Sequence, residues 1–531
     1  MALLASFGRQ GFVVGFAGVL VACGDGGGMV PLPHLDAGTD VVIDVDAAKP
    51  DAGPDEPATI ILGAKDTILL IGTIITPDDV IEGQVLVEGQ MITCVAEGTA
   101  CSEKPNAATA TIIDTHGIIA PGLIDTHNHI LFDIFDNDDW MTPNVNINHS
   151  EWTSEPRYGA MLDVKQCLAN DSQGKPAWCA QTPYGTPAGS LRCEMDKWGE
   201  LKGLIAGTTS IVGLPGTAAA CFGSIARSID VAQNGLGSDK VQTSAIFPPS
   251  KASADGVCAN FASAKTDSYL IHVGEGTDSK ALAEFAQLGA ASTVPNCLFA
   301  PQTAITHCTA FTATEFQTMG TAGMKLIWSP QSNVALYQAT TNVPAALDAN
   351  VTVALAPDWS MGGSQNMLDE MRFAKGWSDG HFASRLTTKD IVTMSTVNPA
   401  KVLALATRIG SIKEGFVADI SVYRGNRATP YDTVVASTPR DVRLVMIGGV
   451  VLYGDDVLQP SALVPASCET MDICGGAKFL CVATAVTTDK LGQTYADIKG
   501  ALEKALTDSD AQTTSDGWNF APLAPIVKCP E

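Results

Sequence analysis

Two histidines that follow an apolar run are the residues of this chain whose types and spacing point most directly to chemistry. Residues 118–125 are apolar apart from a Pro-Gly pair and a final Asp, and His127 and His129 come directly after them. Side chains two residues apart on an extended chain lie on the same face, so both imidazoles point the same way. Two imidazoles at the end of a strand supply half of the ligands that a divalent metal needs. The spacing therefore predicts a metal site.

Further candidate ligands and catalytic groups follow apolar segments much later in the chain. They are His272, Glu275, His307 and Asp358. Each alone could be an ordinary core residue or a helix N-cap. Together they fall at the ends of separate strands, and the carboxyl ends of barrel strands meet on one face. Imidazoles and a carboxylate suit Zn²⁺ or Fe²⁺, with a coordination position left open for water.

The elements that would position these residues alternate between apolar strands and helical stretches. The candidate strands are 118–125, 207–213, 241–247, 268–273, 298–307, 323–329 and 351–356. This alternation is typical of an α/β fold with a parallel sheet. It predicts a TIM-like (β/α)8 barrel over residues 119–407.

Segments on both sides of the barrel carry short β signals separated by turns. We expect residues 59–118 and 408–465 to form one discontinuous β-sandwich domain. Within the barrel, residues 130–195 have no regular pattern and predict a disulfide-pinned loop insertion over the barrel mouth. Residues 466–531 predict a Cys-containing extension with one amphipathic helix near 494–507.

The N-terminal residues carry an export signal. Residues 1–23 have a positive residue, an apolar stretch and Leu-Val-Ala before Cys23, which resembles a bacterial lipobox and implies lipidation of Cys23. An ordinary secretory signal cut nearby, or a weak membrane anchor, is the alternative. Residues 24–58 are acidic and poor in aromatic residues, which predicts a disordered tether. We therefore expect an exported cell-envelope lipoprotein that is held at a membrane through Cys23.

The net charge and the cysteine content agree with that location. The formal charge of −25 argues against nucleic acid or anionic lipid as a partner of the folded part. Fourteen cysteines suit an oxidising compartment. Near neighbours expected to pair, with connectivity left open, are Cys94 with Cys101, Cys167 with Cys179 and Cys193, and Cys468 with Cys474 and Cys481. We expect Cys308 to remain a free buried thiol.

The chain resembles the amidohydrolase superfamily of metal-dependent hydrolases over residues 60–455. The likeness is nearest to the branch that holds cytosine, guanine and S-adenosylhomocysteine deaminases and triazine hydrolases. The segments that carry it are 121–129, with the His-Asn-His triplet, and 200–209, 272–275, 305–308, 328–333 and 410–419. This resemblance implies the barrel and the flanking β domain.

The resemblance also implies roles for the site residues. His127, His129, His272 and Asp358 would hold one divalent metal, Zn²⁺ first and Fe²⁺ as the alternative. Glu275 would move protons, and His307 would orient the metal-activated water or polarise the substrate, so that Glu275, His307 and Asp358 form the catalytic group. The reaction implied is hydrolysis of a C–N bond, by deamination or amide-ring opening, in a small cyclic or heteroaromatic molecule.

Two departures from the family pattern leave alternatives open. The usual Gly-Thr-Asp is Ala-Pro-Asp at 356–358, and residues 241–247 lack the lysine of dinuclear members, with Lys251 just beyond. A dinuclear dipeptidase-like or lactonase-like hydrolase, or an inactive surface binding protein on the same scaffold, are the other hypotheses.

The remaining polar residues near predicted strand ends are weaker candidates. We expect Gln302, Gln331, Asn333 and Trp359 to contact substrate. The other histidines are predicted to be structural or exposed, and they are His34, His116, His149 and His381.

Overall fold

The computed structural model describes residues 56–171, 174–213, 225–230, 235–237, 240–244, 247–483, 492–513 and 517–529. By its internal contacts the chain divides into residues 1–44 and 45–531, and all described residues belong to the second unit. The predicted signal peptide, Cys23 and nearly all of the predicted tether lie outside the described residues. None of the described helices combines the length and apolarity needed to cross a membrane.

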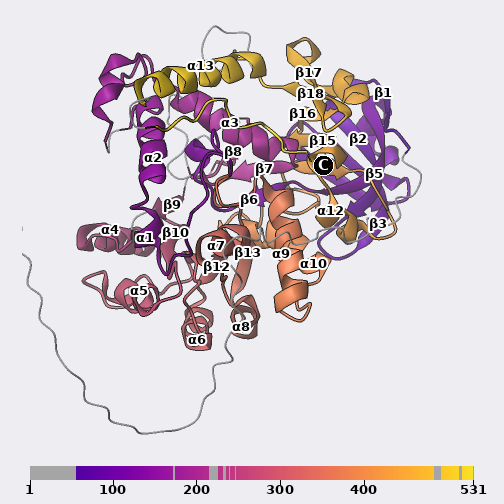
Figure 1. Cartoon of the computed structure of the whole chain (residues 1–531). Coiled ribbons are helices and arrows are strands. Elements are labelled where there is room, and N and C mark those ends of the chain that lie inside the picture. The colour runs from indigo at the N-terminus through magenta and orange to yellow at the C-terminus, as the bar shows by residue number, and fades with distance from the viewer. Residues whose placement is uncertain are drawn as a thin grey trace, which may run out of the picture. The chain divides into compact units, whose positions relative to one another are not determined.

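The two β segments that flank the central part lie in one ten-stranded sheet (Figure 1). The strand order is β17-β18-β16-β15-β14-β5-β2-β3-β4, with β1 paired to β5. The strands are β1 (Thr59–Ile61), β2 (Ala64–Ile75), β3 (Val80–Glu88), β4 (Met91–Glu97), β5 (Ala110–Pro121), β14 (Ile420–Tyr423), β15 (Val442–Ile447), β16 (Val450–Asp455), β17 (Cys468–Ile473) and β18 (Gly476–Cys481). The junction is antiparallel pairing of β14 with the end of β5, where Ile420 faces Pro121.

Buried aliphatic residues hold this sheet together. Leu70 on β2 and Ile113 on β5 are neighbours in the parallel register, and both are fully buried. The strands of the predicted C-terminal extension join the same sheet, because β18 pairs with β16 and buries Phe479 and Leu480. The expected end of the β region at residue 465 was therefore too early. The apolar run of β18 is short, and only its pairing with β16 shows that it belongs to the sheet.

The central part contains parallel strands that follow one another in chain order. They are β6 (Leu123–Asp125), β7 (Thr208–Ile211), β8 (Arg227–Ser228), β9 (Val241–Ser244), β10 (Ser268–Val273), β11 (Thr303–His307), β12 (Lys325–Trp328) and β13 (Thr352–Leu355). They form two sheets, β6-β7-β8 and β9-β10-β11-β12-β13. An isolated parallel bridge between Asn128 and Asp358 connects the residues that follow β6 and β13. The predicted strand at 298–307 begins only at Thr303.

Helices surround these strands in Figure 1. Between β6 and β14 they are α1 (His149–Trp152), α2 (Pro156–Leu168), α3 (Arg192–Ile205), α4 (Lys251–Ala262), α5 (Ser279–Ala290), α6 (Ala313–Ala322), α7 (Pro330–Tyr337), α8 (Val343–Asp348), α9 (Met367–His381), α10 (Thr388–Ser395) and α11 (Val397–Val402). Later come α12 (Pro430–Ala436) and α13 (Tyr495–Thr513). The helix predicted near 494–507 is therefore present and longer than expected. Its Tyr495 ring stacks on Trp198 of α3, with ring centroids 5.9 Å apart.

The insertion at 130–195 is more regular than its sequence pattern suggested. Residues 156–168 form α2, which begins with Glu155 as its N-cap, accepting from the Tyr158 amide, and Pro156 in its first turn. The buried residues of α2 recur at helical spacing. One of them is the charged Lys165, so the apolar residues alone do not show a helical period. Lys165 is buried because it forms an ion pair with Asp171, with Nζ and Oδ2 2.9 Å apart.

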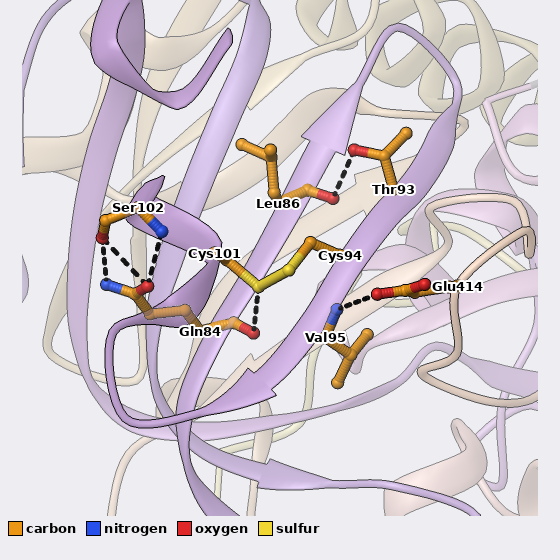
Figure 2. The surroundings of a disulfide bond; sticks show 8 residues. All are labelled: Gln84, Leu86, Thr93, Cys94, Val95, Cys101, Ser102 and Glu414. Carbon is orange, nitrogen blue, oxygen red and sulfur yellow. Dashed lines mark hydrogen bonds between the residues drawn. A yellow bond between two sulfur atoms is a disulfide. The ribbon is translucent and has the colours of Figure 1, made fainter. Parts of the chain in front are cut away.

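Disulfides fasten several of these segments. The described pairs are Cys94–Cys101, Cys167–Cys179, Cys258–Cys297, Cys468–Cys481 and Cys474–Cys529. Figure 2 shows the first of them, beside the hydrogen bonds between Gln84 and Ser102. Cys474 pairs with Cys529 rather than with either neighbour in the sequence. Cys308 is a free, buried thiol, as expected.

Candidate metal centre

The first two site histidines are fixed by backbone contacts with the segment after β13. The amide of Asp358 donates to the carbonyl of His127 at 3.1 Å, and the amide of His129 donates to the carbonyl of Asp358 at 2.6 Å. His127 is fully buried, whereas the side chain of His129 is 22% exposed. The segments that follow the first parallel strand, β6, and the last, β13, are thus joined by hydrogen bonds at the candidate site residues themselves.

The next two histidines come from neighbouring strands. β10 and β11 are paired parallel strands, and His272 and His307 both lie at their carboxyl ends. Their ring centroids are 5.2 Å apart, and the His272 ring lies 4.6 Å from that of His127. Three strands therefore direct imidazoles to one point.

Asp358 completes the group. Its Oδ1 is 2.8 Å from Nε2 of His127 and 3.5 Å from Nε2 of His129, and its Oδ2 accepts from the Ser332 hydroxyl at 2.6 Å. Asp358 and His307 both have a left-handed backbone, with φ of 73° and 74°. Such a conformation costs a non-glycine residue about 1–3 kcal/mol and is concentrated at functional sites. The fold accepts this cost where it aims two side chains inward.

These side chains fit a divalent metal. One ligand atom from each of His127, His272, His307 and Asp358 lies within 4.8 Å of the others. Nδ1 of His127 is buried without a hydrogen-bond partner, which is rare for a buried polar atom. Three imidazoles and a carboxylate are a donor set typical of zinc sites. The tightest group contains His307, whereas the sequence predicted His129 in that position.

The charge states suit metal binding, since imidazole coordinates in its neutral form. Burial lowers the pKa of His129 to about 3 and also lowers the pKa of His272 well below its ordinary value. Burial alone would raise the pKa of Asp358, but the hydrogen bond to His127 and the nearby imidazoles hold it below its usual range. At neutral pH, His129 and His272 therefore offer neutral nitrogens and Asp358 offers an ionised oxygen.

Glu275 lies beside this group and has its own support. Its Oε1 accepts from the Tyr337 hydroxyl at 2.7 Å, and Trp152 Nε1 donates to the same hydroxyl at 2.8 Å. Its Oε2 is 3.9 Å from Nε2 of His307. Burial raises the pKa of Tyr337 well above its ordinary value, so the phenol remains a donor. One carboxylate oxygen is thus fixed, and the other faces His307.

Of the residues predicted to contact substrate, Trp359 lies at the cavity, whereas Asn333 and Gln302 do not. Trp359 lines the cavity. Asn333 is fully buried, and its Oδ1 lies 2.9 Å from Nδ1 of His307, so it orients that ring instead of lining the cavity. Gln302 precedes the first residue of β11, whereas His307 is the last. At about 3.3 Å per strand residue, Gln302 lies at the wrong end of the strand to contact a substrate near His307.

The cavity at the site has a volume of about 200 Å³. It is lined by His129, His149, Trp152, Thr153, Tyr158, Phe247, His272, Glu275, Glu284, His307, Asp358 and Trp359. Trp152 and Tyr158 come from the insertion at 130–195, and the Trp152 ring lies 5.2 Å from that of Trp359. The insertion therefore supplies aromatic side chains that, with Trp359, form an aromatic wall of this cavity.

His149 also lines this cavity, although the sequence predicted a structural or exposed role. Its Nε2 is 2.9 Å from Oε1 of Glu284, and this hydrogen bond raises the pKa of His149. Its backbone amide donates to the carbonyl of Glu275 at 3.2 Å. A lone histidine inside an irregular insertion gives no signal that could have assigned it to the site.

Lys251, the lysine considered for a dinuclear site, is exposed at the start of α4. None of the described residues that line the cavity is a lysine.

Comparison with known proteins gives a family match for part of the chain. Residues 246–452 match the family described as the amidohydrolase family. The chain is 28% identical over 133 residues to a 5-methylthioadenosine/S-adenosylhomocysteine deaminase of Clostridium tetani, which is 24% of this chain and 31% of that protein. That alignment thus spans about a third of the relative.

Two longer matches extend over most of the chain. The 5'-deoxyadenosine deaminase of Methanosarcina barkeri is 24% identical over 412 residues, covering 71% of this chain and 89% of the relative. The structure of an atrazine chlorohydrolase from Arthrobacter aurescens, complexed with zinc, superposes with a TM-score of 0.54 at 16% identity, covering 72% of this chain and 95% of that one. The structural likeness shows a shared fold.

Proposed function

We propose that this protein is a mononuclear metal-dependent hydrolase that cleaves a C–N bond of a small heterocyclic substrate. The observation that carries the proposal is the convergence of the histidines and Asp358 beside Glu275 in one cavity with an aromatic wall. The matched relatives named as deaminases, and the zinc complex of the structural neighbour, support it. The order of the parallel strands and the bridge between Asn128 and Asp358 support a closed (β/α)8 barrel.

His127, His129, His272 and Asp358 would hold the metal, with zinc the first choice. A divalent metal at such a site lowers the pKa of bound water to about 7. Glu275 is placed to accept a proton through the carboxylate oxygen that Tyr337 does not fix, and to deliver it to the leaving group. His307, oriented by Asn333, presents Nε2 toward the same space.

The cavity walls support a planar substrate. Trp152, Tyr158 and Trp359 have rings within 5.1–6.2 Å of one another and line one cavity. Aromatic pairs at such separations favour stacked or edge-to-face contact with a further ring. An aminated purine, pyrimidine or triazine presents a flat ring to this wall and its amino group to the metal ligands.

The test is a substrate screen with an internal control. Purified, zinc-loaded protein is incubated with aminated purines, pyrimidines and triazines for ammonia release, and with cyclic amides for gain of water by mass. Glu275→Gln keeps the size of the side chain but cannot accept a proton. We expect its zinc content to stay near that of the wild type and its turnover to fall about 10²- to 10⁴-fold.

Two results would contradict the assignments. Loss of zinc from Glu275→Gln would make Glu275 a ligand. Full turnover in that variant would show that another group moves the proton, with His307 the first candidate. Turnover of none of the substrates by fully zinc-loaded wild-type protein would favour the alternative of an inactive binding protein.

We also propose that the protein is exported and held at a membrane through lipidated Cys23. The lipobox-like residues before Cys23 support this proposal, as do the disulfides among the described residues.

A further inference from the structure

The C-terminal residues 517–529, here called the strap, lie against the loop 133–140 of the insertion. The amide of Ala524 donates to the carbonyl of Ile134 at 3.2 Å. The ring of Phe520 meets that of Phe135 edge to face, with centroids 5.4 Å apart. Segments nearly 400 residues apart in the sequence thus share backbone and core contacts.

An ion pair adds to this contact. Lys528 Nζ is 3.1 Å from Oδ2 of Asp136 and 2.9 Å from Oδ2 of Asp138. Asp136 is almost fully buried. A buried carboxylate needs a partner, because an unpaired charge inside a protein is costly. Lys528 supplies that partner from the strap.

Both ends of the strap are fastened. Cys529 forms a disulfide with Cys474 in the turn between β17 and β18. At the other end, the carboxylate of Asp510 on α13 accepts from the amides of Phe520 and Ala521, each at 2.8 Å. The strap is therefore held at two points that do not belong to the metal centre.

The loop 133–140 contacts the metal centre on its other side. The amide of Ser360 donates to Oδ1 of Asp133 at 3.1 Å, and its hydroxyl donates to the carbonyl of Phe135 at 2.6 Å. The amide of Gly362 donates to Oδ1 of Asn137 at 2.6 Å. These contacts hold residues 360–362, which directly follow Asp358 and Trp359.

The same loop packs against the aromatic wall through Trp140. Trp140 lies 5.9 Å from Trp359 and 5.4 Å from Tyr158, measured between ring centroids. Movement of the loop 133–140 would therefore shift the wall of the cavity without displacing His272 on β10 or His307 on β11.

From these contacts we propose that the strap is a positioning element of the active site. Lys528 and Phe520 fix the loop 133–140, and this loop fixes residues 358–362 and the aromatic wall on which the substrate lies. The role in substrate binding rests on the proposed function, whereas the mechanical role does not.

The first test replaces one strap residue and follows two properties. Lys528→Met removes the charge, Lys528→Arg restores it, and Lys499→Met removes an exposed lysine on α13 whose partner is Glu503. In zinc-loaded Lys528→Met we expect amide exchange at 133–140 and 358–362 to rise by about threefold or more. For any substrate found by ammonia release, KM should rise by about the same factor while kcat stays within about twofold. Lys528→Arg should recover most of both effects, and Lys499→Met should show neither.

A second test cuts the fastening. The double variant Cys474→Ser/Cys529→Ser should raise exchange at the same two segments. The matched control is Cys94→Ser/Cys101→Ser, because that disulfide joins β4 to residues before β5 (Figure 2) and should leave these segments unchanged. Amide exchange needs no substrate, so its outcome is independent of the proposed chemistry.

Two outcomes would overturn the proposal. Unchanged exchange at 133–140 and 358–362 in both strap variants would show that the strap positions nothing. A rise spread evenly over the whole described sheet and helices would make the strap a general stabiliser. A local rise in exchange with unchanged KM would uphold the mechanical coupling and contradict the role in substrate binding.

Discussion

His129 and His307 are the two site residues between which the roles of metal ligand and orienting group must be divided. Nε2 of His129 lies 3.5 Å from the Asp358 carboxylate, while Nε2 of His307 lies 3.9 Å from that of Glu275. Nδ1 of His307 is already engaged by Asn333. Nε2 of His307 is thereby oriented toward the carboxylate of Glu275, which we propose moves the proton, and we therefore propose His129 as the ligand.

Metal content of two alanine variants separates these roles. Loss of a residue outside the coordination sphere weakens metal affinity by about 10- to 100-fold. We expect His307→Ala to stay within that range and to lose most of its activity, and His129→Ala to lose more affinity than that. Zinc titration against a competing chelator measures both. The reverse order of affinities would make His307 the ligand and His129 the orienting group.

At the residue scale, candidate metal ligands could be predicted because the ends of apolar strands can be recognised in the sequence. His127, His272 and Asp358 each follow a clear apolar run. Gln302 directly precedes β11, at the opposite end of the strand from His307, and closeness to a strand end in the sequence does not tell which end faces the site. The sequence does not show that Asn333 contacts His307. That hydrogen bond depends on how α7 packs, and no local sequence pattern predicts this packing.

At the scale of single elements, the end of β10 shows how tightly the backbone is built around Glu275. Gly274 has φ of +74°, and a Cβ there would lie 2.4 Å from the Phe311 ring. That ring is buried between Phe285 and Phe316, so it has little room to move. Only glycine fits this position without displacing Glu275.

Gly274→Ala should therefore be costly for two reasons. The left-handed backbone and the collision with Phe311 together predict a loss of about 2–5 kcal/mol in the free energy of unfolding, with activity reduced as well. Gly89→Ala is the matched control, because Gly89 also has a positive φ but nothing lies within 4 Å of its Cβ position. It should lose about 1 kcal/mol. Chemical unfolding of both variants measures the difference, and equal losses would show that the Phe311 contact is unimportant.

Elements with a clear period were predictable, and elements fixed by partners far away were not. The strands β10, β12 and β13 are mostly apolar and lie within the residue ranges predicted from the sequence. By contrast, β17 and β18 gain their stability by extending a sheet whose other strands lie elsewhere in the chain. The strap is a clearer example, since its partners lie nearly 400 residues earlier in the sequence.

At the scale of the whole molecule, the charge and the disulfides support the proposal that the protein is exported. A formal charge of −25 favours solubility and disfavours anionic surfaces. An acidic body needs a covalent attachment to stay at such a surface, which a lipid on Cys23 would provide. Stable anchoring requires two acyl chains, and the diacylglyceryl group implied by the lipobox resemblance carries two.

Replacement of Cys23 tests this attachment directly. Mature wild-type protein should begin at Cys23 and fractionate with membranes. Cys23→Ala removes the thiol that would carry the lipid, so the protein should move to the soluble exported fraction, or remain as an uncleaved precursor. Turnover per folded molecule should not change, because the metal ligands all lie beyond residue 120. His34→Ala, a substitution within the predicted tether, is the control and should stay with the membranes. If mature, cleaved Cys23→Ala fractionates with membranes as the wild type does, the attachment is not through this cysteine and the lipoprotein proposal is wrong.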